Sequence, residues 1–237
     1  MHLPPFSRPV HFVYFDLDDT LLDHHHAEHR ALEALHADSD RPFGSHDFEA
    51  VHGAYRIINP VIWKEYAAGD LTKIGAKVGR FSRLLDRLEL DTESDHELAD
   101  RYLAHYSRFW RPIPGAMEAF QEIAASLPVG ILTNGFVEIQ QAKLRRYPAL
   151  ADQSSSVVIS EEVGVLKPHP DLFAEASRRA AASPENILYV GDSLSSDVEG
   201  GIGAGWQVAW FSAATHDHPD VRSFTDWKHF TDALLKV

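Results

Sequence analysis

The 237-residue sequence contains no cysteine. This absence excludes disulfide bonds, cysteine nucleophiles and thiolate metal ligands, and it agrees with a reducing compartment. The sequence also lacks any run of about 18 apolar residues, the length that a membrane-spanning helix needs. The N-terminal segment MHLPPFSRPV has no long apolar stretch of the kind found in secretion signals. We therefore expect a soluble cytoplasmic protein with no membrane partner.

Positive charge is scarce. The sequence has 22 Lys and Arg against 35 Asp and Glu, which gives a formal net charge of −13. Such a balance disfavours nonspecific binding to nucleic acid polymers or to anionic membrane surfaces. An anionic substrate would therefore need a local positive site. The composition leaves the oligomeric state open between a monomer and a homodimer.

Short apolar runs predict a parallel β-sheet. Residues 10–15 (VHFVYF) are β-branched or aromatic and apolar on both faces, as is typical of a buried parallel strand. Similar runs occupy residues 129–132, 157–159 and 187–190, with a weaker one at 207–211. Stretches of helical periodicity lie between them, at 116–127, 137–147, 171–182 and 197–204. This alternation predicts a doubly wound α/β sheet.

The segment from Asp23 to Arg111 breaks the alternation. It has apolar residues at helical spacing but no convincing strand, and Pro112 and Pro114 mark its exit. We predict an α/β core domain made of residues 1–22 and 112–237. Residues 23–111 are predicted to form an inserted helical domain.

Polar residues follow the predicted strands. Asp16 and Asp18 lie two residues apart after the first strand, so their side chains can point the same way. Similar positions are occupied by Thr133-Asn134-Gly135 after the second strand, Lys167 downstream of the third, and Asp192 with Asp197 after the fourth. The carboxyl ends of parallel strands meet at one edge, where ligands bind. We expect these residues to converge there.

The carboxylates in this set suit phosphoryl transfer. Asp16 can attack phosphorus and form an aspartyl phosphate, which divides one hard hydrolysis into two easier displacements. Asp18 can protonate the leaving alkoxide and then deprotonate the attacking water. Asp16 and Asp192 offer the hard oxygen ligands that Mg²⁺ prefers, and Asp197 can support the metal or its waters. A cation would also offset the repulsion between these like charges.

The remaining residues suit phosphate binding. The ammonium of Lys167, the hydroxyl of Thr133 and the backbone amides of Asn134 and Gly135 can neutralise phosphoryl oxygens as charge spreads over them. Taken singly, these residues also have plainer interpretations. Lys167 could be an ordinary lysine of a surface loop, and Thr133-Asn134-Gly135 could form a simple turn. Asp197 could likewise cap a helix.

The sequences DLDDT, TNG, Lys167-Pro168 and GDSLSSD resemble the four motifs of the haloacid dehalogenase (HAD) superfamily, in the same order and spacing. The helical insert resembles the C1 cap, which in that family closes over the site and selects the leaving group. The resemblance implies a role for each matching residue: Asp16 as nucleophile, Asp18 as general acid and base whose backbone carbonyl also binds Mg²⁺, Thr133 as phosphate binder, Lys167 as charge neutraliser, and Asp192 and Asp197 as the acidic pair near the metal.

Longer segments indicate a resemblance to one group within the superfamily. TNGFVEIQQAKL, ISEEVGVLKPHPDLF and GGIGAGW are similar to bacterial pyrimidine 5′-nucleotidases of the YjjG/YfnB type, as is a set of residues in the insert: Asn59, Trp63, Tyr66 and Gly69 with Arg80-Phe81. This resemblance implies a nucleoside 5′-monophosphate substrate. It also implies that some of Asn59, Trp63, Tyr66 and Arg80 contact the nucleoside.

Several alternatives stay open. Another small-metabolite phosphatase, for phosphoglycolate or a sugar phosphate, would use the same core residues. A 2-haloacid dehalogenase would use the Asp16 nucleophile without magnesium, but Asp18 argues against it because dehalogenases of this fold resemble phosphatases without the second Asp. A non-catalytic scaffold is disfavoured because no motif residue is missing. Trp63, Tyr66 and Phe81 could simply pack the helices, and His24–His26 has no assigned role.

Overall fold

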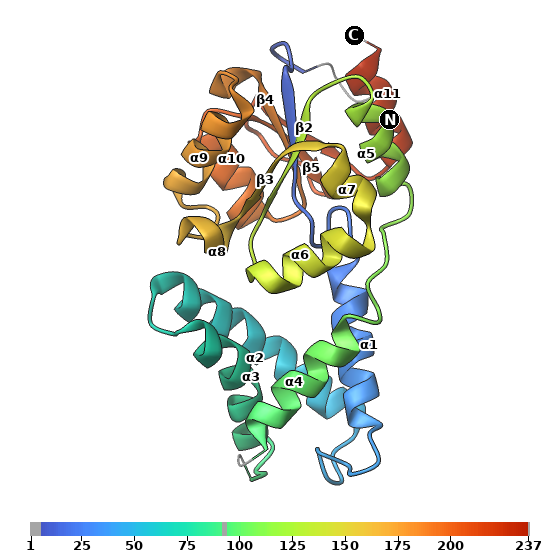
Figure 1. Cartoon of the computed structure of the whole chain (residues 1–237), viewed down its shortest axis with the longest axis vertical. Helices are drawn as coiled ribbons and strands as arrows, with labels where there is room; N and C mark the ends of the chain where they lie inside the picture. Colours follow the sequence, from blue (N-terminus) through green and yellow to red (C-terminus); the bar gives the residue numbers. More distant parts are fainter. Residues whose placement is uncertain (1–5, 92–93, 237) are drawn as a thin grey trace. The chain divides into compact units, whose positions relative to one another are not determined.

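The computed structural model describes residues 6–91 and 94–236. The chain divides into two compact units (Figure 1). One comprises Met1–Asp23 together with Pro112–Val237, and the other is His24–Arg111. The first unit is built on a six-stranded sheet, and the second is helical.

The sheet has the strand order β3-β2-β1-β4-β5-β6, and every pairing is parallel. Its strands are β1 Phe12–Phe15, β2 Val129–Thr133, β3 Ser154–Ile159, β4 Ile187–Gly191, β5 Gln207–Phe211 and β6 Val221–Phe224. The order reverses direction at β1, which pairs with β2 on one side and β4 on the other. Open α/β sheets bind ligands in the crevice at such a switch point, outside the carboxyl ends of the strands.

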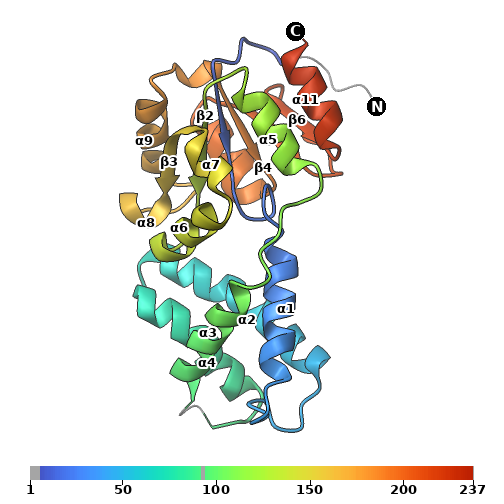
Figure 2. The same ribbon diagram turned by 45° about the vertical axis from the view of Figure 1, so that its right-hand side comes forward.

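Alternating side chains of β1 build two hydrophobic layers. Val13 and Phe15 pack in a cluster with α5 (Ala116–Ala124) and α11 (Trp227–Leu235), whereas Phe12 and Tyr14 pack in another with α9 (Pro170–Ala180). Figures 1 and 2 show α5 and α11 on one side of the sheet and α9 on the other. The sheet is therefore covered on both faces, which confirms the predicted doubly wound α/β fold.

The remaining elements of this unit are short. They are α6 Val137–Arg146, α7 Pro148–Asp152, α8 Ser160–Val163, a 3₁₀ turn at Pro184–Asn186, a π-helical turn at Leu194–Val198 and α10 Glu199–Gly203. The observed β1 begins at Phe12, not at Val10, and β6 was not predicted at all. In β6 only the end residues Val221 and Phe224 are buried, so the sequence shows no apolar run there.

The helical unit contains α1 His24–His36, α2 Phe48–Ala68, α3 Lys73–Arg87 and α4 Asp95–Tyr106. Local signals fix the ends of α2 and α3. Asp47 accepts a hydrogen bond from the backbone N–H of Ala50 at 2.8 Å, and Thr72 accepts one from Gly75 at 3.1 Å. Gly69 ends α2 with a φ of 81°, a conformation that favours glycine.

An aromatic cluster fills the centre of the helical unit. The rings of Tyr55, Phe81 and Tyr102 lie within 5.4–5.9 Å of one another, and all three side chains are buried. Phe81 is therefore a packing residue, in line with the plainer of its two interpretations. Within the described residues, no helix is long and apolar enough to cross a membrane.

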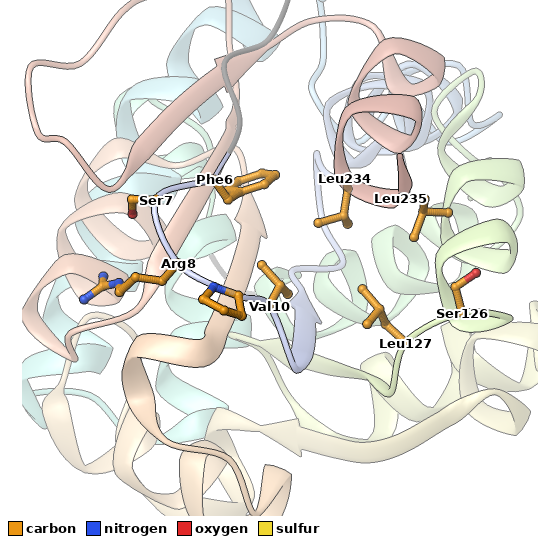
Figure 3. Close-up of a pocket in the computed structure, with 9 residues that line it drawn as sticks. Phe6, Ser7, Arg8, Val10, Ser126, Leu127, Leu234 and Leu235 are labelled. Carbon is orange, nitrogen blue, oxygen red and sulfur yellow. The ribbon is translucent and has the colours of Figure 1, made fainter. Parts of the chain in front are cut away.

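A hollow lies at the opposite edge of the sheet from the predicted site. Its lining includes Val10, just before β1, and Leu127, just before β2, together with Phe6, Leu234 and Leu235 (Figure 3). Among the described residues that line it, Arg8 is charged, and none is a carboxylate or a lysine. The chemistry-bearing residues gather at the other edge.

Candidate active site at the carboxyl edge of the sheet

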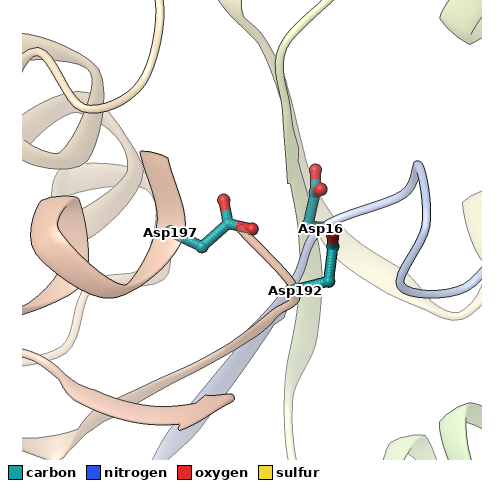
Figure 4. Close-up of side chains that lie close together, drawn as sticks. All are labelled: Asp16, Asp192 and Asp197. Atoms are coloured by element: carbon teal, nitrogen blue, oxygen red, sulfur yellow. The ribbon is translucent and has the colours of Figure 1, made fainter. Parts of the chain in front are cut away.

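Three carboxylates meet where the strand order reverses. Asp16 directly follows β1, Asp192 directly follows β4, and Asp197 comes from the π-helical turn. One oxygen of each lies within 4.8 Å of the others, and Figure 4 shows Asp192 and Asp197 directed toward Asp16. Asp16 is 7% exposed and Asp197 is fully buried. The predicted convergence of these acidic residues is present in the fold.

The local backbone around Asp197 requires a glycine. A Cβ added to Gly191 would lie 2.5 Å from the Asp197 Oδ2 atom, too close for any side chain. The same oxygen accepts a hydrogen bond from the backbone N–H of Ser193 at 3.0 Å. Asp197 thus satisfies a backbone donor of its own turn and also belongs to the acidic cluster. The plainer interpretation, that Asp197 caps a helix, is wrong: Ser193 caps this turn by accepting from the backbone N–H of Ser196, and Asp197 lies within the turn.

Lys167 is the cation of this cluster. Its Nζ atom lies 2.8 Å from Asp16 Oδ1 and 2.8 Å from Asp197 Oδ1, and the whole side chain is buried. Burial disfavours its charge, but the two carboxylates outweigh burial and raise the pKa of Lys167. Lys167 also donates to the hydroxyl of Tyr189 at 2.7 Å. Sequence reasoning missed Tyr189, because in the strand ILYVG it looks like a core aromatic.

Crowding shifts the protonation of the cluster. Burial, reinforced by the neighbouring charge of Asp197, raises the pKa of Asp192 to about 7. Burial also raises the pKa of Asp16 well above its ordinary value, although Lys167 opposes the shift. Burial and mutual repulsion thus disfavour the ionised form of these carboxylates. A divalent cation bound to their hard oxygens would stabilise all three negative charges together. The donor set therefore fits Mg²⁺.

This crowding predicts a pH-dependent stability. Because the pKa of Asp192 is raised to about 7, the metal-free folded protein holds a proton that the unfolded chain releases near pH 4. Its stability should therefore fall as the pH rises from about 4 to 7. We expect Asp192→Asn to raise the melting temperature by roughly 2–8 °C at pH 8, equivalent to about 1–2 kcal/mol.

Thermal melts in EDTA at pH 4.5 and pH 8 would measure this gain, which should shrink at the lower pH. Asp152→Asn, which alters an exposed carboxylate at the end of α7, is the matched control and should show no such pH dependence. A lower melting temperature for Asp192→Asn at pH 8 would contradict the inferred crowding.

The TNG loop is tied to its neighbours by specific hydrogen bonds. Asn134 Oδ1 accepts from the backbone N–H of Lys167 at 2.8 Å, and Asn134 Nδ2 donates to the Lys167 carbonyl at 3.2 Å. The backbone N–H of Gly135 donates to Ser160 Oγ at 3.0 Å. The Asn134 side chain thus joins two motif loops. The Gly135 amide would have to exchange partners to bind a phosphate.

Asp18 lies at the same edge, held by residues of α6. Lys143 Nζ lies 2.6 Å and 2.7 Å from the two carboxylate oxygens, and Gln140 Nε2 donates to Asp18 Oδ2 at 3.0 Å and to Thr133 Oγ1 at 2.8 Å. Sequence reasoning missed both residues. With Leu144, they are the buried residues of α6, on the face where apolar side chains would be expected, and the sequence alone does not distinguish them from exposed polar residues.

The four predicted nucleoside contacts belong to the helical unit. Asn59, Trp63 and Tyr66 share one face of α2, at helical spacing. Asn59 is buried, and its Nδ2 donates to Glu28 at 3.1 Å, whereas its Oδ1 accepts no hydrogen bond from the described part of the chain. Trp63 and Tyr66 are half-buried and pack edge to face, with ring centres 5.8 Å apart. Arg80 is buried and donates to the Tyr55 hydroxyl and the Ala76 carbonyl.

A sequence profile of the haloacid dehalogenase-like hydrolase family matches residues 11–205. The chain belongs to that family. The match confirms the family predicted from the four motifs. The pyrimidine 5′-nucleotidase YjjG of Escherichia coli (strain K12) is 31% identical over 210 residues, which are 88% of this chain and 89% of YjjG.

Two further likenesses span nearly the whole chain. A glyceraldehyde 3-phosphate phosphatase of Pyrococcus furiosus is 29% identical over 231 residues, which are 96% of this chain and 90% of that enzyme. The magnesium-bound crystal structure of the HAD-hydrolase YfnB from Bacillus subtilis superposes with a TM-score of 0.80 at 26% identity, covering 96% of this chain and 100% of that chain.

Proposed function

We propose that this HAD hydrolase is a Mg²⁺-dependent phosphatase that hydrolyses nucleoside 5′-monophosphates through an aspartyl phosphate. The observation that carries the proposal is the convergence of Asp16, Lys167 and the acidic pair Asp192 and Asp197 at the switch point of the sheet. The resemblance to YjjG over 88% of this chain supports the nucleotide as substrate. We place this activity in the cytoplasm.

In the proposed reaction, a carboxylate oxygen of Asp16 attacks phosphorus as the bond from phosphorus to the leaving oxygen breaks. Asp18 gives its proton to that oxygen, so the nucleoside leaves as a neutral alcohol. A water then attacks phosphorus and loses a proton to Asp18, and this step releases phosphate and regenerates the Asp16 carboxylate. The two steps balance to the hydrolysis of one phosphomonoester.

Other residues stabilise charge in this mechanism. Lys167, already in contact with Asp16, and the Thr133 hydroxyl would hold the transferring phosphoryl group, together with the backbone amides of Asn134 and Gly135. Mg²⁺ bound by Asp16, Asp192, Asp197 and the backbone carbonyl of Asp18 would supply the positive charge that a phosphoryl group needs in so acidic a site.

A second candidate has its own support. The glyceraldehyde 3-phosphate phosphatase is 29% identical, against 31% for YjjG, and its match covers 96% of this chain, against 88%. That relative favours a phosphatase for another small metabolite with the same core chemistry. The dehalogenase alternative is disfavoured because Asp18 is present and is held by Lys143 and Gln140.

A phosphatase screen distinguishes these candidates. Purified protein would be assayed for phosphate release from pyrimidine and purine nucleoside monophosphates, glyceraldehyde 3-phosphate, phosphoglycolate and sugar phosphates, with Mg²⁺ and with EDTA. The highest kcat/KM on a nucleoside monophosphate would support the nucleotidase. A preference for glyceraldehyde 3-phosphate would replace it with the second candidate, and no turnover of any phosphoester would refute the phosphatase.

We propose that the helical unit acts as the cap and that Asn59, Trp63, Tyr66 and Arg80 contribute to recognition of the nucleoside. The Oδ1 atom of Asn59 is buried and receives no hydrogen bond from a described residue, and the two aromatic side chains are partly exposed. Arg80 is bonded to Tyr55, so we infer that its contribution includes holding the helices in place.

Replacing Trp63 or Tyr66 by Ala should therefore change substrate choice. Core residues set the chemical step, whereas contacts with the leaving group set discrimination between substrates. We expect kcat/KM for nucleoside monophosphates to fall by about 10- to 100-fold, and that for 4-nitrophenyl phosphate by less than about threefold.

Val61→Ala is the matched control, because Val61 lies on the same helix and is 45% exposed. It should leave both substrates unaffected. Equal losses on both substrates in Trp63→Ala and Tyr66→Ala, with a lower melting temperature, would show that these aromatics only pack the helices. The proposed substrate would then be an unspecified phosphomonoester and no longer a nucleoside monophosphate.

A further inference from the structure

Helix α6 carries a cation and an amide in an unusual place. Lys143 is 2% exposed and Gln140 is 1% exposed, and they lie three residues apart on the buried face of the helix. Burying an ammonium or an amide costs free energy unless charged or polar partners form hydrogen bonds or ion pairs with it. The partners of these two side chains are residues of the predicted reaction site.

Lys143 and Gln140 both donate hydrogen bonds to the Asp18 carboxylate. Lys143 Nζ lies 2.6 Å and 2.7 Å from the two oxygens of Asp18, and Gln140 Nε2 lies 3.0 Å from one of them. The Asp18 side chain is 25% exposed, whereas that of Lys143 is 2% exposed. The ammonium therefore lies inside the protein and the carboxylate at its surface, which differs from a solvent-exposed ion pair of little energetic value.

Gln140 also joins Asp18 to the TNG loop. The same amide nitrogen donates to Thr133 Oγ1 at 2.8 Å and to the Asn134 carbonyl at 3.1 Å. The proposed acid and base and the proposed phosphate binder are thus fixed to one helix. A group that transfers a proton is most effective when its orientation is set before the reaction.

We propose that Lys143 and Gln140 are positioning residues that hold the Asp18 carboxylate in the orientation needed for proton transfer with the leaving oxygen. They act through Asp18 and touch no substrate. This inference rests on the proposed phosphatase function. It assigns to α6 a role that depends on the leaving group, because only a poor leaving group needs the proton from Asp18.

Lys143→Met tests the inference, because Met keeps the length and apolar stem of the side chain but removes the ammonium. The substrates are uridine 5′-monophosphate, whose alkoxide needs a proton to leave, and 4-nitrophenyl phosphate, whose phenolate does not. We expect kcat/KM to fall by about 100-fold for the first and by less than about threefold for the second. Gln140→Leu should also reduce kcat/KM more for uridine 5′-monophosphate than for 4-nitrophenyl phosphate, but with a loss common to both substrates because Gln140 also bonds Thr133.

A double-mutant cycle separates positioning from structure. In an Asp18→Asn background, Lys143→Met should reduce kcat/KM for uridine 5′-monophosphate by no more than about twofold, because the group that it positions is gone. Arg145→Met is the control, because it removes the charge of an exposed residue on the same helix. It should behave as the wild type. If Lys143→Met fails to fold, Gln140→Leu carries the same comparison without a change in charge.

The wild type is assayed first, with glyceraldehyde 3-phosphate as the alkyl phosphate if uridine 5′-monophosphate is not turned over. Hydrolysis of no phosphoester would overturn the proposed function and this inference with it. Normal wild-type activity with equal losses on alkyl and aryl substrates in Lys143→Met, or with a further loss in the Asp18→Asn background, would overturn the inference alone.

Discussion

Asp16→Asn is expected to reduce turnover of every phosphoester by at least about 1,000-fold, since an amide cannot replace the carboxylate as nucleophile. The variant should fold normally. Burial and the neighbouring charges of Asp197 and Asp192 raise the pKa of Asp16, so removing its charge relieves repulsion within the cluster. We therefore expect the melting temperature of the metal-free protein to hold or to rise.

Steady-state phosphate release and thermal melts of the same preparation would check both expectations. Asp19→Asn is the matched control, because it removes the same charge three residues away. Asp19 has a φ of 58°, a conformation that Asn tolerates well. The control should keep activity within about tenfold of the wild type. Activity of Asp16→Asn above a few per cent of the wild type would refute the covalent mechanism.

Much of the sheet and its active edge were predictable, because β1, β2 and β4 are short apolar runs that end in or next to a polar residue. Asp16 and Asp192 directly follow β1 and β4, and the parallel order places these two strand ends side by side. Once the strands are recognised, topology alone brings these carboxylates together. Lys167 lies eight residues beyond the end of β3, so its place downstream of that strand was a weaker signal, and its motif strengthened it.

Positions that depend on tertiary partners were not predictable. Gln140 and Lys143 look like ordinary polar residues of a helix, and only the fold shows that their side chains are buried against Asp18. The hydroxyl of Tyr189 is likewise invisible in an apolar strand sequence, although it accepts from Lys167 and donates to the Leu132 carbonyl at 2.8 Å. Each is a polar group whose burial is offset by a partner far away in the sequence.

Glu161 illustrates the same limit. In the structure, Glu161 Oε2 accepts a hydrogen bond from the backbone N–H of Val137 at 2.6 Å, at the first residue of α6. A carboxylate at a helix N-terminus stabilises the free N–H groups there. Glu161 therefore helps to fix the helix that carries Gln140 and Lys143.

Removing the metal should abolish activity. With excess EDTA we expect no measurable phosphate release, and added Mg²⁺ should restore it, because the acidic cluster cannot accept a phosphoryl group without a compensating cation. Ca²⁺ should substitute poorly, since it is larger and takes a looser shell of oxygen ligands. Titration of activity with each metal after EDTA treatment and gel filtration would measure these differences.

Asp192→Ala should raise the Mg²⁺ concentration needed for half-maximal activity by at least tenfold, about 1.4 kcal/mol of binding free energy. Glu199→Gln is its control, because Glu199 is an exposed acidic residue outside the acidic cluster, at the start of α10. A tenfold shift in Glu199→Gln as well would indicate a general charge effect. Full phosphate release in excess EDTA would count against the metal-site assignment, because Asp16 and Asp192 would then act without a bound cation.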